Sequence, residues 1–438
     1  MLLLVKRYFV LNPIMVLVLV LGCGVAPEPP IPPVEEQGEV LRSEVQRVTN
    51  PQVSQAVENS QVMGNTDFSM TLMRELGAQE GNLFLSGHSI STALAMTYAG
   101  AKGTTATQMA QTLGFGLAQG DLHSVFNALD LALSERGQGA KASDGTAFRL
   151  RVVNAIWGQK GYSFLGSFLD ELARNYDAGM RVLDYVTDPE VARTRINGWV
   201  AKQTEDRIPE LIPQGAIDGT TRLVLTNAVY FNAAWAEPFS PDATSNSFFN
   251  LADGTIASVP TMHSERTAAY AANDTFRTLE LPYDGNELSM VLILPEAGAM
   301  QDVEQMLTAE KFATIVEGLQ DEKVDITLPK FEFSSRFALK KQLAALGMTD
   351  AFDGGLADFS GMDGSRRLYI GNVIHKAFIK VDEAGTEAAA ATAVLMSGSA
   401  APTPDEVKTF HANRPFLFFI RDRATGVILF SGRMSNPS

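Results

Sequence analysis

Residues 382–394 read Asp382-Glu383-Ala384-Gly385-Thr386-Glu387-Ala388-Ala389-Ala390-Ala391-Thr392-Ala393-Val394. They follow residues 375–381, whose side chains alternate as in a β-strand. Four consecutive alanines are compatible with a helix, but Gly385 and the flanking threonines argue against a stable one. Read with a period of two, the even positions from Thr386 to Met396 line one face of a strand, and Glu387 falls on the other face. A segment of small residues with the pattern of a buried strand is a candidate for a conformational switch.

The rest of the chain indicates segregated helices and strands. Residues 67–76 place apolar side chains on one helical stripe, and residues 223–231 form an apolar run that suits a buried strand. Residues 279–281 and 288–294 predict a strand pair, and residues 336–346 predict a helix. This mixture predicts an α+β fold. Since 45% of the residues are hydrophobic and no Pro/Gly/Ser-rich linker follows residue 64, we expect one large domain at residues 65–438.

Several sequence blocks carry a family resemblance, and they occur in a fixed order. They are residues 82–86, 89–96, 100–105, 226–231 with Trp235, 281–283, 328–331, 346–348, 413–422 and 430–433. Together with residues 382–394, these blocks resemble the serpins, a family of serine protease inhibitors, over residues 65–437. The resemblance implies eight or nine helices, three β-sheets and an exposed reactive loop at about residues 383–408.

The resemblance also implies roles for particular residues. The hinge of the loop comprises Glu383, Gly385, Thr386, Glu387, Ala388, Ala389, Ala390, Ala391 and Thr392. The breach, where the loop first enters the central sheet, comprises Trp235, Lys330 and Glu383, with an implied ion pair between the last two. The shutter beneath the sheet comprises Ser86, Ser89, Asn227 and His375.

The resemblance gives His375 a structural role, and Gly87 departs from the family pattern. A lone histidine beside apolar strand residues is usually a packed, hydrogen-bonded core residue, and the resemblance places His375 in the shutter as a structural residue. The family usually has a proline after the first shutter serine, where this chain has Gly87. Glycine adds freedom to the unfolded chain, so the sequence leaves open whether Gly87 weakens the shutter.

The implied activity is suicide-substrate inhibition with a covalent protease complex. A protease cleaves the loop, its serine forms an acyl intermediate, and the loop inserts into the central sheet before the ester is hydrolysed. Family spacing places the reactive bond between Ser399 and Ala400. The bond between Ala400 and Ala401 is the second choice, and that between Met396 and Ser397 the third.

The residues around the reactive bond narrow the class of target. Residues 397–401 are all small, and no Lys or Arg lies between Lys380 and Lys408. Small residues suit proteases with shallow or apolar specificity pockets, which predicts an elastase-like or subtilisin-like target. A cysteine protease of similar specificity is an alternative, as is a non-inhibitory carrier, chaperone or storage protein. We expect a monomer.

Catalytic motifs do not favour an enzyme. The five histidines form no His-Glu-x-x-His metal motif, no Gly-x-Ser-x-Gly elbow is present, and a single cysteine excludes a Cys-x-x-Cys pair. Residues 100–104 have the wrong order for a phosphate loop, and we interpret them as a helix-to-helix turn. We therefore predict neither catalysis nor a cofactor or metal.

The charge of the chain argues against polyanionic partners. Acidic residues outnumber basic ones by 50 to 35, for a formal net charge of −15. Such an acidic chain is a poor candidate for binding nucleic acid. Residues 121–136, which correspond to the heparin-binding helix of some serpins, contain a single basic residue, Arg136. We expect no heparin cofactor.

The N-terminal segment resembles a bacterial lipoprotein signal. Lys6 and Arg7 precede a mostly apolar stretch that is too short for a comfortable transmembrane helix, and Gly22 precedes Cys23, the single cysteine. We predict a signal peptide at residues 1–22, lipidation of Cys23 and a Pro/Glu/Gln-rich tether at residues 23–64. The domain would then be lipid-anchored outside the cell or in the periplasm. With an ordinary secretory signal, it would be secreted.

Overall fold

The computed structural model describes residues 39–77, 81–143, 145–386 and 406–438, all within one structural unit, 36–438. The signal peptide, Cys23, the hinge from Glu387 to Thr392 and the three candidate reactive bonds lie outside the described residues. The loop can therefore be described only at its two ends.

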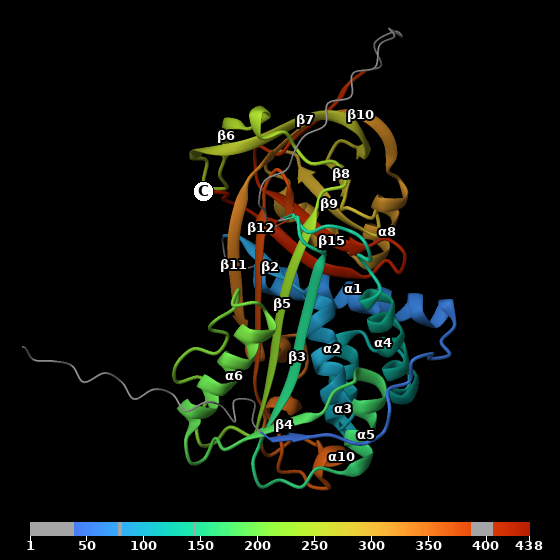
Figure 1. Ribbon diagram of the computed structural model, residues 1–438, viewed down its shortest axis with the longest axis vertical. Coiled ribbons are helices and arrows are strands. Elements are labelled where there is room, and N and C mark those ends of the chain that lie inside the picture. The colour runs from blue at the N-terminus through green and yellow to red at the C-terminus, as the bar shows by residue number, and fades with distance from the viewer. Residues whose placement is uncertain (1–38, 78–80, 144, 387–405) are drawn as a thin grey trace, which may run out of the picture. The chain divides into compact units, whose positions relative to one another are not determined.

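The helices of the described residues comprise ten α-helices and two short 3-10 helices (Figure 1). They are α1 (Gln55–Gly77), α2 (Gly87–Tyr98), α3 (Gly103–Leu113), α4 (Gln119–Ser134), α5 (Gly166–Tyr176), α6 (Pro189–Gln203), η1 (Pro241–Ala243), α7 (Met300–Met306), α8 (Ala309–Glu317), α9 (Lys340–Ala345), η2 (Asp350–Phe352) and α10 (Ser360–Asp363). The ten α-helices are one or two more than the eight or nine that the family resemblance implies, and the shortest of them, α10, has four residues.

A seven-stranded sheet forms the centre of the fold. Its order is β1 (Glu39–Leu41), β4 (Met180–Leu183), β3 (Arg149–Gln159), β5 (Leu223–Ala234), β13 (Gly385–Thr386), β12 (Ile370–Val381) and β11 (Phe331–Ala338). Every residue of β5 except the last is buried, which agrees with the apolar run in the sequence.

The other nine strands form a second hydrogen-bonded network. They are β2 (Leu83–Leu85), β6 (Ser245–Asn250), β7 (Ile256–Ala272), β8 (Phe276–Pro282), β9 (Leu288–Pro295), β10 (Gln320–Pro329), β14 (Lys408–His411), β15 (Phe416–Asp422) and β16 (Ile428–Met434). Three sheets were expected. The second and third sheets are continuous here, because β7 belongs to both. Its first residues pair with β6, its middle part pairs with β10, and its last residues pair with β8.

The two faces of the central sheet pack against different layers. On one face, Ala377, Ile379 and Val381 of β12 join a core cluster with the second network. On the other face, Ile374 joins a smaller cluster with Trp199 and its neighbours on α6. Figure 1 shows α6 lying over one face of the central strands. The strands that would have to separate for insertion are therefore buried on both sides.

Two predicted boundaries are wrong. The tether predicted at residues 23–64 extends too far, because β1 pairs with β4 and α1 begins at Gln55. Polar residues hold this segment to the domain: Arg47 bonds to Asn127 and Asp130 of α4.

The helix predicted at residues 336–346 is also too long, because β11 continues to Ala338 and α9 starts at Lys340. In both cases pairing with a distant strand overrides the local pattern.

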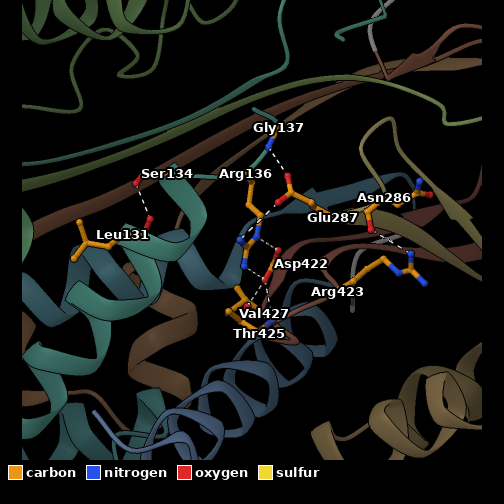
Figure 2. Close-up of polar contacts among 10 residues, drawn as sticks. All are labelled: Leu131, Ser134, Arg136, Gly137, Asn286, Glu287, Asp422, Arg423, Thr425 and Val427. Carbon is orange, nitrogen blue, oxygen red and sulfur yellow. Dashed lines mark hydrogen bonds and ion pairs between the residues drawn. The ribbon is translucent and has the colours of Figure 1, made fainter. Parts of the chain in front are cut away.

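The single basic residue of the presumed heparin segment serves a structural purpose. Arg136 lies just after α4, where its Nε donates to Asp422 Oδ1 over 2.6 Å (Figure 2). The Asp422 side chain is fully buried and also accepts from Thr425. The adjacent Gly137 N–H donates to Glu287. This cluster ties the end of α4 to the turns that follow β8 and β15.

Candidate functional site

The site is built around a gap between β5 and β12. These strands pair in parallel from Leu223 and Ile370 up to Val229 and Ala377. Above that level the pairing stops, and β13 lies between their ends. Thr386 pairs with Val381 of β12 and with Ala233 of β5, and it is antiparallel to both. Gly385 and Thr386 thus already occupy the top of the gap.

Gly385 allows this close fit. A Cβ atom at this position would lie 2.2 Å from the carbonyl oxygen of Ala233, which is far inside van der Waals contact. The backbone of β13 can therefore approach β5 only with glycine here. The sequence pattern identified Gly385 as a helix breaker, and the structure adds this steric reason.

Thr386 is the first member of the predicted inward-facing series. Its side chain is buried, and its hydroxyl lies 2.8 Å from the hydroxyl of Tyr283. The Ser143 hydroxyl donates to the carbonyl of Thr386 over 3.1 Å. The later members of the series, beginning with Ala388, lie outside the described residues.

The breach is closed by an ion pair. Lys330 Nζ lies 2.7 Å from Glu383 Oε2, and the Thr244 hydroxyl donates to Glu383 Oε1 over 2.7 Å. Partial burial by itself raises the pKa of Glu383, but the hydrogen bonds from Lys330 and Thr244 outweigh it and the net pKa is lowered. Glu383 is therefore an anion at neutral pH.

Trp235 holds the backbone that leads into the hinge. Its indole N–H donates to the carbonyl of Asp382 over 3.0 Å, and its ring stacks on Tyr283. Its backbone N–H donates to the carbonyl of Ala384, and the N–H of Phe239 donates to that of Glu383. These bonds fix the direction in which the chain enters the gap.

The four shutter residues converge lower in the gap, where β5 and β12 are still paired. His375 and Asn227 are register partners, and His375 Nδ1 bonds to Asn227 Oδ1. His375 Nε2 accepts from the backbone N–H of Ser86 over 3.2 Å. Asn227 Nδ2 donates to Ser89, and Ser86 caps α2 by accepting from the N–H of Ser89. The network joins both strands of the gap to the start of α2.

These hydrogen bonds define the protonation state of His375. Nε2 accepts a hydrogen bond from the backbone N–H of Ser86, so Nδ1 must carry the hydrogen that is donated to Asn227. Burial lowers the pKa of His375 to about 3. The imidazole is thus neutral at physiological pH and can act as a donor on one side and an acceptor on the other.

Three further residues of this site were not among the predicted site residues. Asn154 of β3 accepts from Asn227 and from Ser89 in the shutter, and Thr244 and Tyr283 contact the breach and hinge. Asn154 could have been suspected as an amide inside the apolar run of a predicted strand. Tyr283 lies in the block 281–283 that carries the family resemblance but was given no role, and Thr244 lies in a short connecting segment without a comparable signal.

Gly87 is tightly packed at the start of the shutter helix. It is the first residue of α2 and is buried, and a Cβ atom there would lie 2.4 Å from the Cβ of Ser69 on α1. Close packing of α1 against α2 therefore leaves room for glycine alone. The added freedom of glycine affects the unfolded chain, whereas the folded shutter is held by this contact.

In the described residues, no group of three or more His, Cys, Asp or Glu side chains could hold a metal ion. The same part of the chain contains no helix of the length and apolar character that a bilayer crossing requires.

Comparison with known proteins agrees with this geometry. The family model for serpins, described as serine protease inhibitors, matches residues 63–437. The chain belongs to the serpin family. An uncharacterised serpin-like protein of Thermococcus kodakarensis is 41% identical over 370 residues, covering 84% of each chain. Human leukocyte elastase inhibitor is 39% identical over 384 residues, covering 85% of this chain and 98% of that protein.

A solved structure shows the same architecture. The native state of tengpin, a thermophilic serpin, superimposes with a TM-score of 0.80 at 29% identity, covering 91% of this chain and all of that one. The α+β serpin fold is thereby confirmed. In this serpin, residues 39–62 precede the matched region yet contribute β1 and the start of α1.

Proposed function

We propose that this serpin inhibits serine proteases by suicide-substrate trapping, with insertion of its cleaved loop between β5 and β12. The observation that supports this most directly is β13. Its two residues are hydrogen-bonded to both neighbours in antiparallel orientation, at the top of a gap whose lower part is still closed. The proposed insertion is an extension of a strand that already exists.

The strand pairing explains why insertion is favourable. Opening the gap breaks one parallel ladder, between β5 and β12. A strand that continues β13 forms two antiparallel ladders in its place, and antiparallel pairing is slightly more stable per residue. Insertion therefore adds backbone hydrogen bonds and buries the side chains of the inserted strand.

The register of β13 predicts where each loop residue would go. Continuing from the pairing of Thr386 with Val381 and Ala233, Thr392 would align with His375 and Asn227. A small hydroxyl side chain would then stand between the two shutter partners and could replace their direct hydrogen bond. Alanine at positions 388 and 390 would pass between the strands without collision.

The length of the gap suits the trapping step. β12 has 12 residues, or about 40 Å at ~3.3 Å per residue. A protease attached as an acyl ester near the reactive bond would be carried over this length, because the cleaved loop remains covalently joined to β12. Displacement of that size can deform the attached active site before water hydrolyses the ester.

An elastase-like or subtilisin-like protease is the proposed target. Residues 397–401 are small and uncharged, which fits a shallow or apolar specificity pocket. The similarity to human leukocyte elastase inhibitor supports the same class. Our first choice for the reactive bond remains that between Ser399 and Ala400.

Incubation with elastase and subtilisin tests the proposal. We expect a covalent complex that survives SDS, together with release of a C-terminal peptide whose mass locates the cleaved bond. Thermal melting before and after loop cleavage gives a second measurement, and insertion predicts a large increase in the melting temperature. Cleavage without a complex and without stabilisation would show a non-inhibitory serpin instead.

We also propose that Cys23 is lipidated and that it anchors a monomeric domain outside the cell or in the periplasm. The support is the position of Cys23 after a short apolar segment. Metabolic labelling with a radioactive fatty acid should mark the wild type, whereas Cys23→Ser should be unlabelled and leave the membrane fraction. Equal labelling of both proteins would contradict the proposal.

A further inference from the structure

An apolar surface lies exposed beside the breach. Phe248 on β6 is 74% exposed, the highest value among the described large hydrophobic residues. Ile256 on β7 is 62% exposed, the same as Leu356 elsewhere in the chain. Ile256 pairs with Asn250, which is two residues from Phe248 along β6. Since alternate residues of a strand share a face, Phe248 and Ile256 project from the same side of the hairpin. We call these two residues the hairpin patch.

The hairpin lacks the usual protection of an exposed edge. Within the described residues, β6 pairs with β7 alone, so its other edge is open. Exposed edges are usually blunted by charged residues or proline. Residues 245–262 contain one charged residue, Asp253 in the turn, although 19% of the chain is charged. Depletion of charge around an exposed aromatic residue is characteristic of the centre of a protein interface.

Hydrogen bonds connect this hairpin to both ends of the reactive loop. On the hinge side, Thr244 bonds to Glu383 just before β6, and the backbone of Lys330 donates to the carbonyl of Pro260 on β7. On the far side of the loop, the backbone and side-chain amides of Asn250 donate to the carbonyl of Asn413, two residues after β14. In Figure 1, β6 and β7 cross the end of the domain at which β12 finishes.

We propose that the hairpin patch is a second contact surface for the protease that the loop captures. This inference rests on the proposed function. Phe248 lies four residues from Thr244, or roughly 13 Å along the strand. Thr244 bonds to Glu383 at the base of the loop, and a protease domain of about 225 residues has a radius of gyration of roughly 17 Å, so the patch lies within reach of a protease that docks near this end of the loop. The partner surface beside its active-site cleft would be apolar and weakly charged.

The test compares two double variants. In F248S/I256S the patch is removed, and in V186S/L356S two other exposed hydrophobic residues, which are 59% and 62% exposed, are replaced as a matched control. Both variants should keep the wild-type melting temperature, because no buried contact is lost. The second-order rate of complex formation with the protease that wild type traps should fall about tenfold in F248S/I256S and remain unchanged in V186S/L356S. At saturating protease, the first-order rate of loop insertion should be the same for all three proteins.

Each other outcome has a defined meaning. Equal second-order rates for wild type and F248S/I256S would overturn the inference, as would an equal loss in the control. A concentration-dependent dimer in sedimentation that F248S/I256S abolishes would assign the patch to a second copy of the chain and also overturn it. If wild type is cleaved without a covalent complex, the proposed function fails. In that case the second-order rate of loop cleavage still measures docking of the protease. A tenfold lower cleavage rate in F248S/I256S, with no change in V186S/L356S, would support a protease contact at the hairpin patch.

Discussion

The gap between β5 and β12 is closed at two levels by different chemistry. At the breach, the closing pair is charged and partly exposed: the Lys330 and Glu383 side chains are 35% and 13% accessible. At the shutter, His375 and Asn227 are fully buried and neutral, and they form a network with Ser86 and Ser89. The His375–Asn227 pair joins the two strands that insertion would separate, whereas Lys330 precedes β11 and Glu383 follows β12, so the breach pair lies at the entrance of the gap.

This difference determines how each closure can open. When an exposed ion pair separates, water replaces the lost contacts and the cost is small. When a buried network separates, every donor and acceptor must find another partner or lose its full hydrogen-bond energy. We infer that the breach can admit the first loop residues readily, whereas the shutter opens only as an inserted residue replaces its contacts.

The largest effect is expected from blocking the entrance. Thr386→Arg places a long charged side chain where Thr386 is buried against Tyr283. Burial of an unpaired charge is costly, so the hinge should no longer enter the gap and the protein should become a substrate. Gel electrophoresis with the target protease should show complete cleavage and no covalent complex. Thr386→Ser, which keeps the hydroxyl, should still form complexes; a covalent complex with Thr386→Arg would contradict the insertion pathway.

A large effect is also expected at the shutter. Asn227→Ala removes the partner of His375 Nδ1 and leaves that donor buried and unsatisfied. The free energy of unfolding should fall by about 3 kcal/mol, measured by urea denaturation. Ser89→Ala removes one hydroxyl from the same network and should cost only about 1 kcal/mol. Equal losses would show that the network is not centred on the His375–Asn227 bond.

Acid should destabilise the shutter in a measurable way. Burial lowers the pKa of His375 from 6.5 to about 3, and those of His88 and His123 to about 4. The unfolded state therefore binds protons that the folded state does not, and stability falls as the pH drops from about 6.5 towards 4. Each histidine contributes about 1.4 kcal/mol per pH unit to this slope.

The His375→Gln variant isolates the contribution of the shutter. Unfolding measured between pH 6 and 4.5 should have a slope smaller than that of wild type by up to about 1.4 kcal/mol per pH unit. His88→Gln serves as the control, because it removes another buried imidazole and should reduce the slope equally while leaving the gap intact. A slope that is unchanged in His375→Gln would mean that His375 is not held neutral by burial.

The smallest effect is expected at the breach. Lys330→Ala should lower the free energy of unfolding by less than about 1 kcal/mol, because the pair is partly solvated. The loss should shrink further at high salt, since ions screen the pair. The matched variant Lys330→Arg keeps the charge and should be close to wild type. A loss as large as that of Asn227→Ala would remove the distinction between the two closures.

Much of this site could be predicted from the chain alone, but unevenly. The start of the hinge could be predicted because small residues with a period of two are a local property of residues 382–396, and Thr386 is the member of that series that the structure describes. The candidate residues of the breach and shutter followed from sequence blocks in a fixed order. The contribution of Asn154 could not be predicted, because it depends on the register between β3 and β5, which places it opposite Asn227.

Gly87 is a second residue whose environment depends on a contact that the sequence does not show. As a residue type it indicated a flexible backbone, yet its neighbour Ser69 on α1 leaves no room for a side chain. Likewise, the polar composition of residues 39–54 predicted a tether, whereas β1 pairs with the edge strand β4. In each case the deciding contact joins residues that are distant in the sequence or packed through space.

The family, the mixture of helices and strands, and the pattern of a strand that can be buried could all be inferred from the sequence alone. These depend on composition and on periodicity within short segments. The tertiary structure was needed to show that Thr386 already lies between β5 and β12, that His375 is neutral with a hydrogen on Nδ1, and that Phe248 on β6 stays exposed. Those features depend on strand register and burial, which arise when distant segments pack together.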